Sequence, residues 1–127
     1  MIYKVLKPEL FIKDTKLLGK YSLWENNAMT PTHICHIKSF GNKKDVEFGM
    51  NNHFWMGFNT ENNTLKIQCD SYGGMCGFEF TKKDLKIKGL SKNDRDCMNY
   101  TFNLIDELIE EKIIEEKNEN IKNKTII

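Results

Sequence analysis

A chain of 127 residues, of which 39% are hydrophobic and 29% charged, is long enough for one domain with a single buried core. Its formal net charge of +1 excludes a strong overall attraction to nucleic acids or membranes. The charge is nevertheless uneven, because residues 1–92 carry 14 Lys against 9 acidic residues (+5) and residues 93–127 carry 5 basic against 9 acidic residues (−4). We therefore expect a basic body with an acidic C-terminal segment.

Cellular location and origin are predicted from composition alone. The apolar runs are short and interrupted by Lys, so no membrane segment is expected and the protein is predicted to be cytosolic. Its four cysteines lack Cys-x-x-Cys spacing, which favours reduced and mostly buried thiols. Abundant Lys, Asn and Ile, with Arg95 as the one Arg, are typical of an AT-rich coding sequence. Together with the small size, this favours an origin in a phage or mobile element.

The N-terminal third has weak secondary-structure signals. Ile2–Leu6 predicts a short strand. Pro8 at the start and Gly19 at the end are typical of a short helix over residues 8–19, with a strand as the alternative. Residues 20–24 are too few to assign, and Glu25–Pro31 is predicted to be a loop because Pro31 disfavours helix at the preceding residue.

Two further strands are expected before the middle of the chain. Thr32–Phe40 has the composition of a strand, and residues 41–44 are predicted to form a turn. In residues 45–50, Val46, Phe48 and Met50 alternate with Asp45, Glu47 and Gly49. This alternation predicts a half-buried strand with one wet face.

The clearest pattern is an antiparallel meander over residues 54–80. Phe54–Phe58, Thr64–Cys69 and the shorter Cys76–Phe80 alternate between apolar and other residues, and Asn- and Gly-rich turns separate them. Alternation assigns nine positions to the core face of the sheet: Phe54, Met56, Phe58, Leu65, Ile67, Cys69, Cys76, Phe78 and Phe80. The opposite face is predicted to carry Trp55, Lys66, Gln68, Asp70 and Glu79, and Gly57 is expected to leave a gap beside Trp55.

From Ser91 the period changes to that of one long amphipathic helix. Its apolar stripe comprises Cys97, Met98, Thr101, Phe102, Leu104, Ile105, Leu108, Ile109 and Ile113. Ser91 or Asn93 is the expected N-cap. The predicted fold is therefore α+β: an antiparallel β-meander of about five strands with this helix packed on one face. We expect a single domain over residues 1–117 and a frayed polar tail over residues 118–127.

Candidate chemical sites are few. The soft and imidazole ligands that could bind zinc are His33, Cys35, His36, His53, Cys69 and Cys76. We predict no metal site, because His36 would point away from His33 and Cys35 on a strand. Asp70 and Glu79 could oppose each other as paired carboxylates, but acids on a wet face are usually solvated. The chain has no Gly-x-Gly-x-x-Gly, His-Glu-x-x-His or Gly-x-Ser-x-Gly motif, so neither enzymatic activity nor a cofactor is predicted.

The sequence therefore favours a non-catalytic binding or inhibitor-type protein that acts through a protein partner, with homodimerisation as a related outcome. The predicted binding residues are Trp55, Lys66, Gln68 and Tyr72 on the first surface, and Glu107, Glu110 and Glu111 on the second. One alternative is single-stranded nucleic-acid binding through the sheet face around Trp55. Another is the capture of a small nucleotide-like ligand by the glycine-rich loop Tyr72–Gly77.

Overall fold

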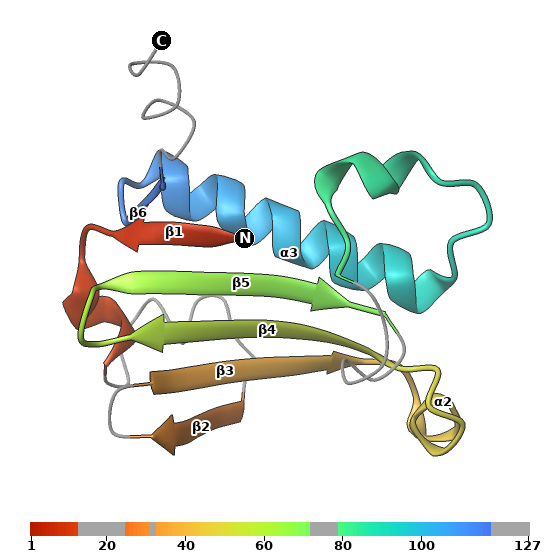
Figure 1. Ribbon diagram of the computed structural model, residues 1–127. Coiled ribbons are helices and arrows are strands. Elements are labelled where there is room, and N and C mark those ends of the chain that lie inside the picture. Colours follow the sequence, from red (N-terminus) through yellow and green to blue (C-terminus); the bar gives the residue numbers. More distant parts are fainter. Residues whose placement is uncertain (13–24, 31–32, 72–78, 118–127) are drawn as a thin grey trace, which may run out of the picture.

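The computed structural model describes residues 1–12, 25–30, 33–71 and 79–117 (Figure 1). These residues form a six-stranded sheet in the order β2-β3-β4-β5-β1-β6, and every neighbouring pair is antiparallel. The elements in chain order are β1 (Ile2–Val5), the 3₁₀ helix η1 (Pro8–Phe11), β2 (Glu25–Thr30), β3 (His33–Phe40), α2 (Lys43–Glu47), β4 (Asn52–Asn59), β5 (Thr64–Asp70), the 3₁₀ helix η2 (Lys82–Lys86), α3 (Lys92–Glu110) and β6 (Ile114–Glu116). The predicted α+β class is confirmed, with the three-residue β6 as a sixth strand.

Four consecutive strands, β2 to β5, form an antiparallel meander, of which β4 and β5 are the first two predicted runs, and the two ends of the described chain complete the sheet. β1 pairs with β5, where Ile2 lies opposite Lys66. β6 then pairs with the other side of β1, where Val5 lies opposite Ile114. The N-terminal strand is therefore an interior strand of the sheet, held between residues from the middle and the end of the chain.

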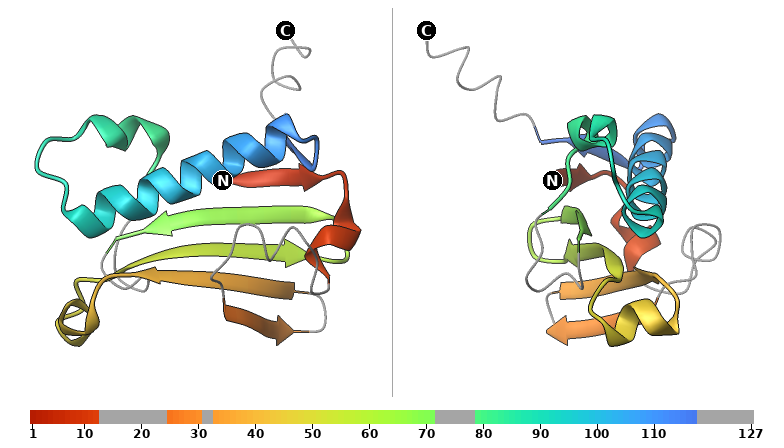
Figure 2. Two further views of the ribbon diagram at one scale, coloured as in Figure 1. Left: turned by 180° about the vertical axis from the view of Figure 1, so that it is seen from behind. Right: turned by 90° about the vertical axis from the view of Figure 1, so that its right-hand side faces the viewer.

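One face of the sheet is covered by α3 (Figure 2). All seven predicted core positions that the structure describes are fully or almost fully buried: Phe54, Met56, Phe58, Leu65, Ile67, Cys69 and Phe80. The other two, Cys76 and Phe78, lie outside the described residues. The predicted stripe of α3 packs against this face, with Cys97, Met98 and Leu108 among its most buried residues. The predicted core positions of the meander and of α3 are thus confirmed among the described residues.

The start of α3 is fixed by polar contacts. Ser91 is the N-cap, as predicted: its Oγ accepts a hydrogen bond from the main-chain N–H of Asp94 at 3.1 Å. The Asp94 carboxylate accepts one in return from the main-chain N–H of Ser91 at 3.3 Å. Asp94 is buried and also accepts a hydrogen bond from the side-chain amide of Asn52 on β4 at 2.6 Å. This contact joins the first turn of the helix to the sheet.

Two predictions for the N-terminal third can be compared with the structure in part or in full. The helix predicted over residues 8–19 begins at Pro8 as a four-residue 3₁₀ helix with a turn at Ile12, and its remaining residues, 13–19, lie outside the described part. Residues 25–30, expected to be a loop, form β2 at one edge of the sheet. An edge strand needs hydrogen-bonding partners on one side only, so the polar sequence Glu25-Asn26-Asn27 gives little of the usual strand pattern.

The half-buried strand predicted over residues 45–50 is also wrong. Residues 43–47 form the short helix α2, which projects from the sheet between β3 and β4 (Figure 1). Asn42 and Asp45 form a capping box: the main-chain N–H of Asp45 donates to Asn42 Oδ1 at 2.8 Å, and that of Asn42 donates to Asp45 Oδ2 at 3.0 Å. Gly49, at φ +67°, ends the turn. Local capping therefore overrides the two-residue alternation.

The third run of the meander does not continue as a full strand in the described residues. β1 pairs with residues 64–66 of β5, on the side where that run was expected. Phe80 donates its main-chain N–H to the carbonyl oxygen of Cys69 at 2.8 Å, and Glu79 forms an isolated bridge with Asp70. Residues 76–78 lie outside the described part of the chain. Among the described helices, none combines the length and apolar character needed to cross a membrane.

Candidate functional site

The face of the sheet opposite α3 brings together three of the predicted binding residues. We call it the Trp55 face, and its central positions are Cys35, Ile37, Ser39, His53, Trp55, Gly57, Lys66, Gln68 and Asp70. Trp55 lies directly opposite Gln68, and Gly57 lies opposite Lys66. Lys66 Nζ is 6.0 Å from the centre of the Trp55 ring, at the outer limit of a cation–π contact. The expected proximity of Trp55, Lys66 and Gln68 is therefore present.

The Trp55 indole is held over its own strand. An added Cβ at Gly57 would lie 2.5 Å from Trp55 Cη2 and 2.7 Å from Cζ2, so the predicted gap is present and the ring fills it. The ring also hydrogen-bonds with the thiol of Cys35, the residue opposite Gly57 on β3. Cys35 is fully buried, and this burial raises the pKa of its thiol against the weaker effect of the Trp55 hydrogen bond. Trp55 is thus half-buried, and its ring is held in place by Gly57 and Cys35 on the side that faces the sheet.

A polar cluster that the sequence did not predict borders Trp55 at one end. Ser39 Oγ lies 3.1 Å from His53 Nδ1, and Asn51 Nδ2 lies 3.1 Å from His53 Nε2. An amide nitrogen can only donate, so Nε2 accepts and a neutral ring donates from Nδ1 to Ser39. This is the reverse of nucleophile activation, in which the ring nitrogen takes the hydroxyl proton. The cluster is therefore suited to donate and accept hydrogen bonds at the border of the Trp55 face, as a polar rim around the aromatic ring.

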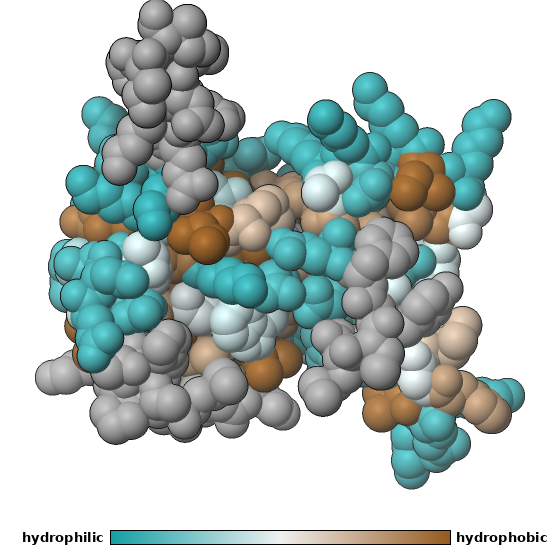
Figure 3. Space-filling view, in the orientation of Figure 1, coloured by the Kyte–Doolittle hydropathy of each residue, from teal (hydrophilic) through white to brown (hydrophobic). Residues whose placement is uncertain are grey.

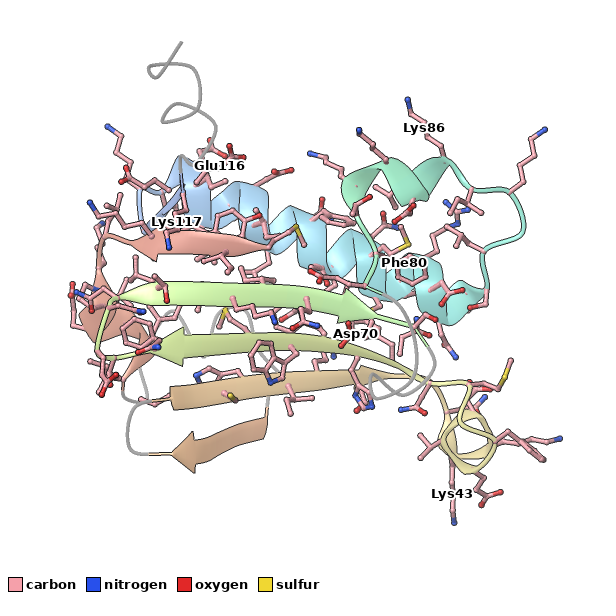
Figure 4. The ribbon with its side chains drawn as sticks, in the orientation of Figure 1. Lys43, Asp70, Phe80, Lys86, Glu116 and Lys117 are labelled. Carbon is pink, nitrogen blue, oxygen red and sulfur yellow. The ribbon has the colours of Figure 1, made fainter. Side chains whose placement is uncertain are left out.

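Asp70 lies next to this rim, opposite His53 (Figure 4). Its carboxylate accepts a hydrogen bond from the Gln68 amide at 3.1 Å. Burial raises the pKa of Asp70, and the Gln68 hydrogen bond opposes that rise. Glu79 lies across from Asp70, as predicted, but its carboxylate binds the amino group of Met1 at 3.0 Å. The two acids therefore have separate partners.

The other predicted binding residues lie elsewhere. Tyr72 and the rest of the Tyr72–Gly77 loop fall outside the described residues. Glu107, Glu110 and Glu111 are exposed at the C-terminal end of α3, which packs on the other side of the sheet from Trp55. The two predicted surfaces are therefore separated by the thickness of the domain, and one flat partner surface cannot contact both.

The candidate metal ligands that the structure describes are dispersed. Cys35 pairs with Gly57 on the Trp55 face, whereas the adjacent His36 pairs with Met56 on the core face, as the alternation predicts. His36 is buried, and burial lowers its pKa, while a hydrogen bond with the main chain of Phe11 acts in the opposite direction. Nothing is described of the His33 side chain or of Cys76. The described residues contain no group of three His, Cys, Asp or Glu side chains arranged to hold a metal ion.

A second surface feature, missed by the sequence interpretation, is an apolar tip on the projecting segment that contains α2. Val46, Phe48 and Met50 are 52%, 70% and 48% exposed. Brown and tan atoms gather at this corner of the molecule in Figure 3. In the sequence, the capping pair Asn42 and Asp45 indicates a short helix where alternation indicates a strand. Recognising this helix would have shown that the apolar residues after it need not face the core.

A cleft of about 570 Å³ separates the base of this segment from the start of α3. Its wall is about half polar, and its polar side chains include Asn42 and Asp45 on one side and Ser91, Asn93 and Asp96 on the other. Asn93 donates to Asp45 across it at 2.9 Å, and the Lys92 ammonium binds Asp96. The polar groups of the cleft are therefore engaged with one another and give little reason to assign a ligand.

The known proteins provide no further constraint on this site. Comparison of the chain with protein-family models gives no match. Comparisons with curated proteins and with solved structures also give no match.

Proposed function

We propose that the protein is a non-catalytic binding module that engages a protein partner through the Trp55 face. The observation that carries this proposal is the restrained Trp55 indole, half-buried above Gly57 and Cys35 on the sheet face opposite α3. A large aromatic ring with a fixed orientation loses little conformational entropy on binding, which is why Trp is common among the residues that dominate interface energies.

The surroundings of Trp55 favour a partner of a particular chemistry. Ile37 is half-buried beside Trp55, and Ile2 is 51% exposed next to Lys66 on β1. Lys66 is exposed and makes no ion pair with any described residue. The matching surface is therefore an apolar pocket with a carboxylate at its border, while the His53 cluster and Gln68 supply hydrogen bonds at the rim.

The edge of the sheet adds a second element to the proposal. β2 is the terminal strand on that side, and no described strand pairs with its outer edge. A partner strand could extend the sheet there while contacting the Trp55 face. The cytosolic location, the mobile-element origin and homodimerisation stay predictions, and homodimerisation is one outcome of the experiment below.

Nucleic-acid binding through the same face receives less support. Such binding needs cations along one continuous path around the stacking ring. Lys43 is on α2 and Lys86 is on η2, at separate corners of the molecule (Figure 4). Lys38 extends over Phe40 and Tyr100 on the α3 side, with Nζ 5.1 and 5.8 Å from their ring centres. Lys66 is beside Trp55, but these three lysines lie away from it. Ligand capture by Tyr72–Gly77 involves residues outside the described part and is not proposed.

The test is native mass spectrometry after gentle purification from the host, with nuclease treatment in a parallel sample. Trp55→Ala is the informative variant. Phe48→Ala is its matched control, because it removes an exposed aromatic side chain from the apolar tip. We expect a stoichiometric protein partner, or a homodimer, that survives nuclease and Phe48→Ala and is lost with Trp55→Ala.

Three results would contradict the proposal. Loss of the partner with Phe48→Ala but not with Trp55→Ala would assign binding to the apolar tip. A nuclease-sensitive assembly would assign it to nucleic acid. A protein that stays monomeric and bare at all concentrations found in the host would leave the Trp55 face without a binding role.

A further inference from the structure

Two buried cysteines meet between the sheet and the helix. Cys69 is on the core face of β5, and Cys97 is in the second turn of α3. Both side chains are fully buried, and their sulfur atoms are 2.9 Å apart. We propose that Cys69 and Cys97 are an oxidation site, at which a disulfide forms and links β5 covalently to α3.

The separation of the sulfur atoms carries the proposal. A disulfide bond is about 2.05 Å long, so an approach of roughly 0.9 Å converts the contact into a bond. The two residues belong to elements that already pack together, since α3 contacts β5 along the core face. The folded chain therefore provides the proximity that a disulfide requires, without rearrangement of the fold.

The third described cysteine, Cys35, lies where it cannot form a disulfide with Cys69 or Cys97. Cys35 lies on the Trp55 face, covered by the Trp55 ring, whereas Cys69 and Cys97 lie on the other side of the same sheet. The packed sheet prevents contact between them. Among the described cysteines, the geometry allows one pairing only.

The oxidant in this proposal is a low-molecular-weight disulfide of the glutathione class. The thiolate of one cysteine attacks a sulfur of that disulfide, and a mixed disulfide forms as one small thiolate leaves. The second cysteine thiolate then attacks the protein sulfur of the mixed disulfide and expels the other small thiolate. Two protein thiols are thus oxidised, one small disulfide is reduced to two thiols, and the two thiol protons are transferred to them.

The site is expected to react during folding or local opening, and not on the surface of the intact protein. Neither sulfur is accessible to solvent in the folded state. The neighbouring Cys69 sulfur and burial also raise the pKa of Cys97, so little thiolate is present there. Once formed, the bond closes the loop from residue 69 to residue 97. A loop of that length restricts the unfolded chain enough to raise the thermal midpoint by about 10 °C.

The experiment is refolding of the reduced, denatured protein in a buffer containing oxidised and reduced glutathione. Free thiols are then alkylated under denaturing conditions and the peptides are mapped by mass spectrometry. Cys35→Ser with Cys76→Ser is the informative variant, because it retains only Cys69 and Cys97. We expect a 69–97 linkage in both proteins and a midpoint that falls by about 10 °C when reductant is added.

A matched variant separates the linkage from general effects of oxidation. Cys97→Ala should fold, as judged by its far-ultraviolet circular dichroism, and should lose the dependence of the midpoint on reductant. The proposal is overturned if Cys69 and Cys97 remain alkylatable after oxidative refolding, if the mapped linkage involves Cys35 or Cys76, or if Cys97→Ala keeps the reductant-dependent shift.

Discussion

The substitution Gly57→Ala tests how Trp55 is held. The new Cβ would lie 2.5 Å from Trp55 Cη2, whereas carbon atoms in normal contact are about 3.5–4.0 Å apart, an overlap of at least about 1 Å. Pairing of β4 with a strand on each side fixes the Gly57 main chain, which lies between Cys35 and Lys66. The indole must therefore move, and it loses its hydrogen bond with Cys35.

We expect the free energy of unfolding to fall by about 1–3 kcal/mol, which combines the cost of overpacking with the lost hydrogen bond. Without a steric clash, a Gly→Ala substitution is expected to change the free energy of unfolding in the opposite direction. Replacing Gly by Ala in extended backbone usually stabilises by about 0.4–1 kcal/mol, because it restricts the unfolded chain. The same substitution should therefore be neutral or stabilising once the Trp55 ring is absent.

Urea denaturation of four proteins makes the measurement: the original chain, Gly57→Ala, Trp55→Ala and the double variant. The expected result is a coupling energy of about 1.5–4 kcal/mol between the two positions. A coupling below about 0.5 kcal/mol would refute the reasoning, because it would mean that the ring does not lie over Gly57.

Three further predictions concern the helix cap and two titrating groups. Ser91→Ala should lower the free energy of unfolding by about 1 kcal/mol, because the main-chain N–H of Asp94 loses its acceptor; an unchanged urea midpoint would contradict this. Burial lowers the pKa of His36, so the unfolded chain binds more protons and stability should fall as the pH drops below about 6.5. His36→Met should flatten that slope, and an equal slope in the variant would assign it to another group. Burial raises the pKa of Asp70, so the folded state binds more protons and this contribution to stability should be lost as the pH rises above about 4. Asp70→Asn should remove the loss, measured as the unfolding free energy from pH 3 to pH 7.

The periodic parts of the sequence predicted the fold well. Alternation in β4 and β5 assigned Phe54 and Ile67 to the core and Trp55 and Lys66 to the other face, because burial against α3 fixes which side of a strand is apolar. The period of α3 was equally informative for the same reason. Where packing in the core requires apolar residues at regular positions, the apolar periodicity of the sequence predicts which side chains are buried.

Other elements are stabilised by interactions that do not produce a periodic pattern of apolar residues in the sequence. β2 is stabilised by main-chain pairing to β3, to which its polar sequence gives no guide. α2 depends on the capping contact between Asn42 and Asp45, which prevails over the alternation of Val46, Phe48 and Met50.

In the candidate site too, some features could be predicted from the periodic pattern and others could not. The proximity of Trp55, Lys66 and Gln68 follows from alternation plus one hairpin. The positions of Ser39 and Asp70 on either side of His53 depend on the registers of two strand pairs, which residue types alone do not specify.

The interior position of β1 has a consequence for synthesis of the chain. β1 is synthesised before the other described strands, yet Val5 pairs with Ile114, 109 residues later in the chain. At about 5–20 residues per second, β1 must wait roughly 5–20 s for its second neighbour, while β2 to β5 can already pair with one another. During that interval Tyr3 and Val5, both buried in the finished sheet, are exposed to the cell. Among the described strands, the last one made is thus a neighbour of the first, and a nascent chain stalled before residue 114 would present the unpaired edge of β1 as a site for chaperones.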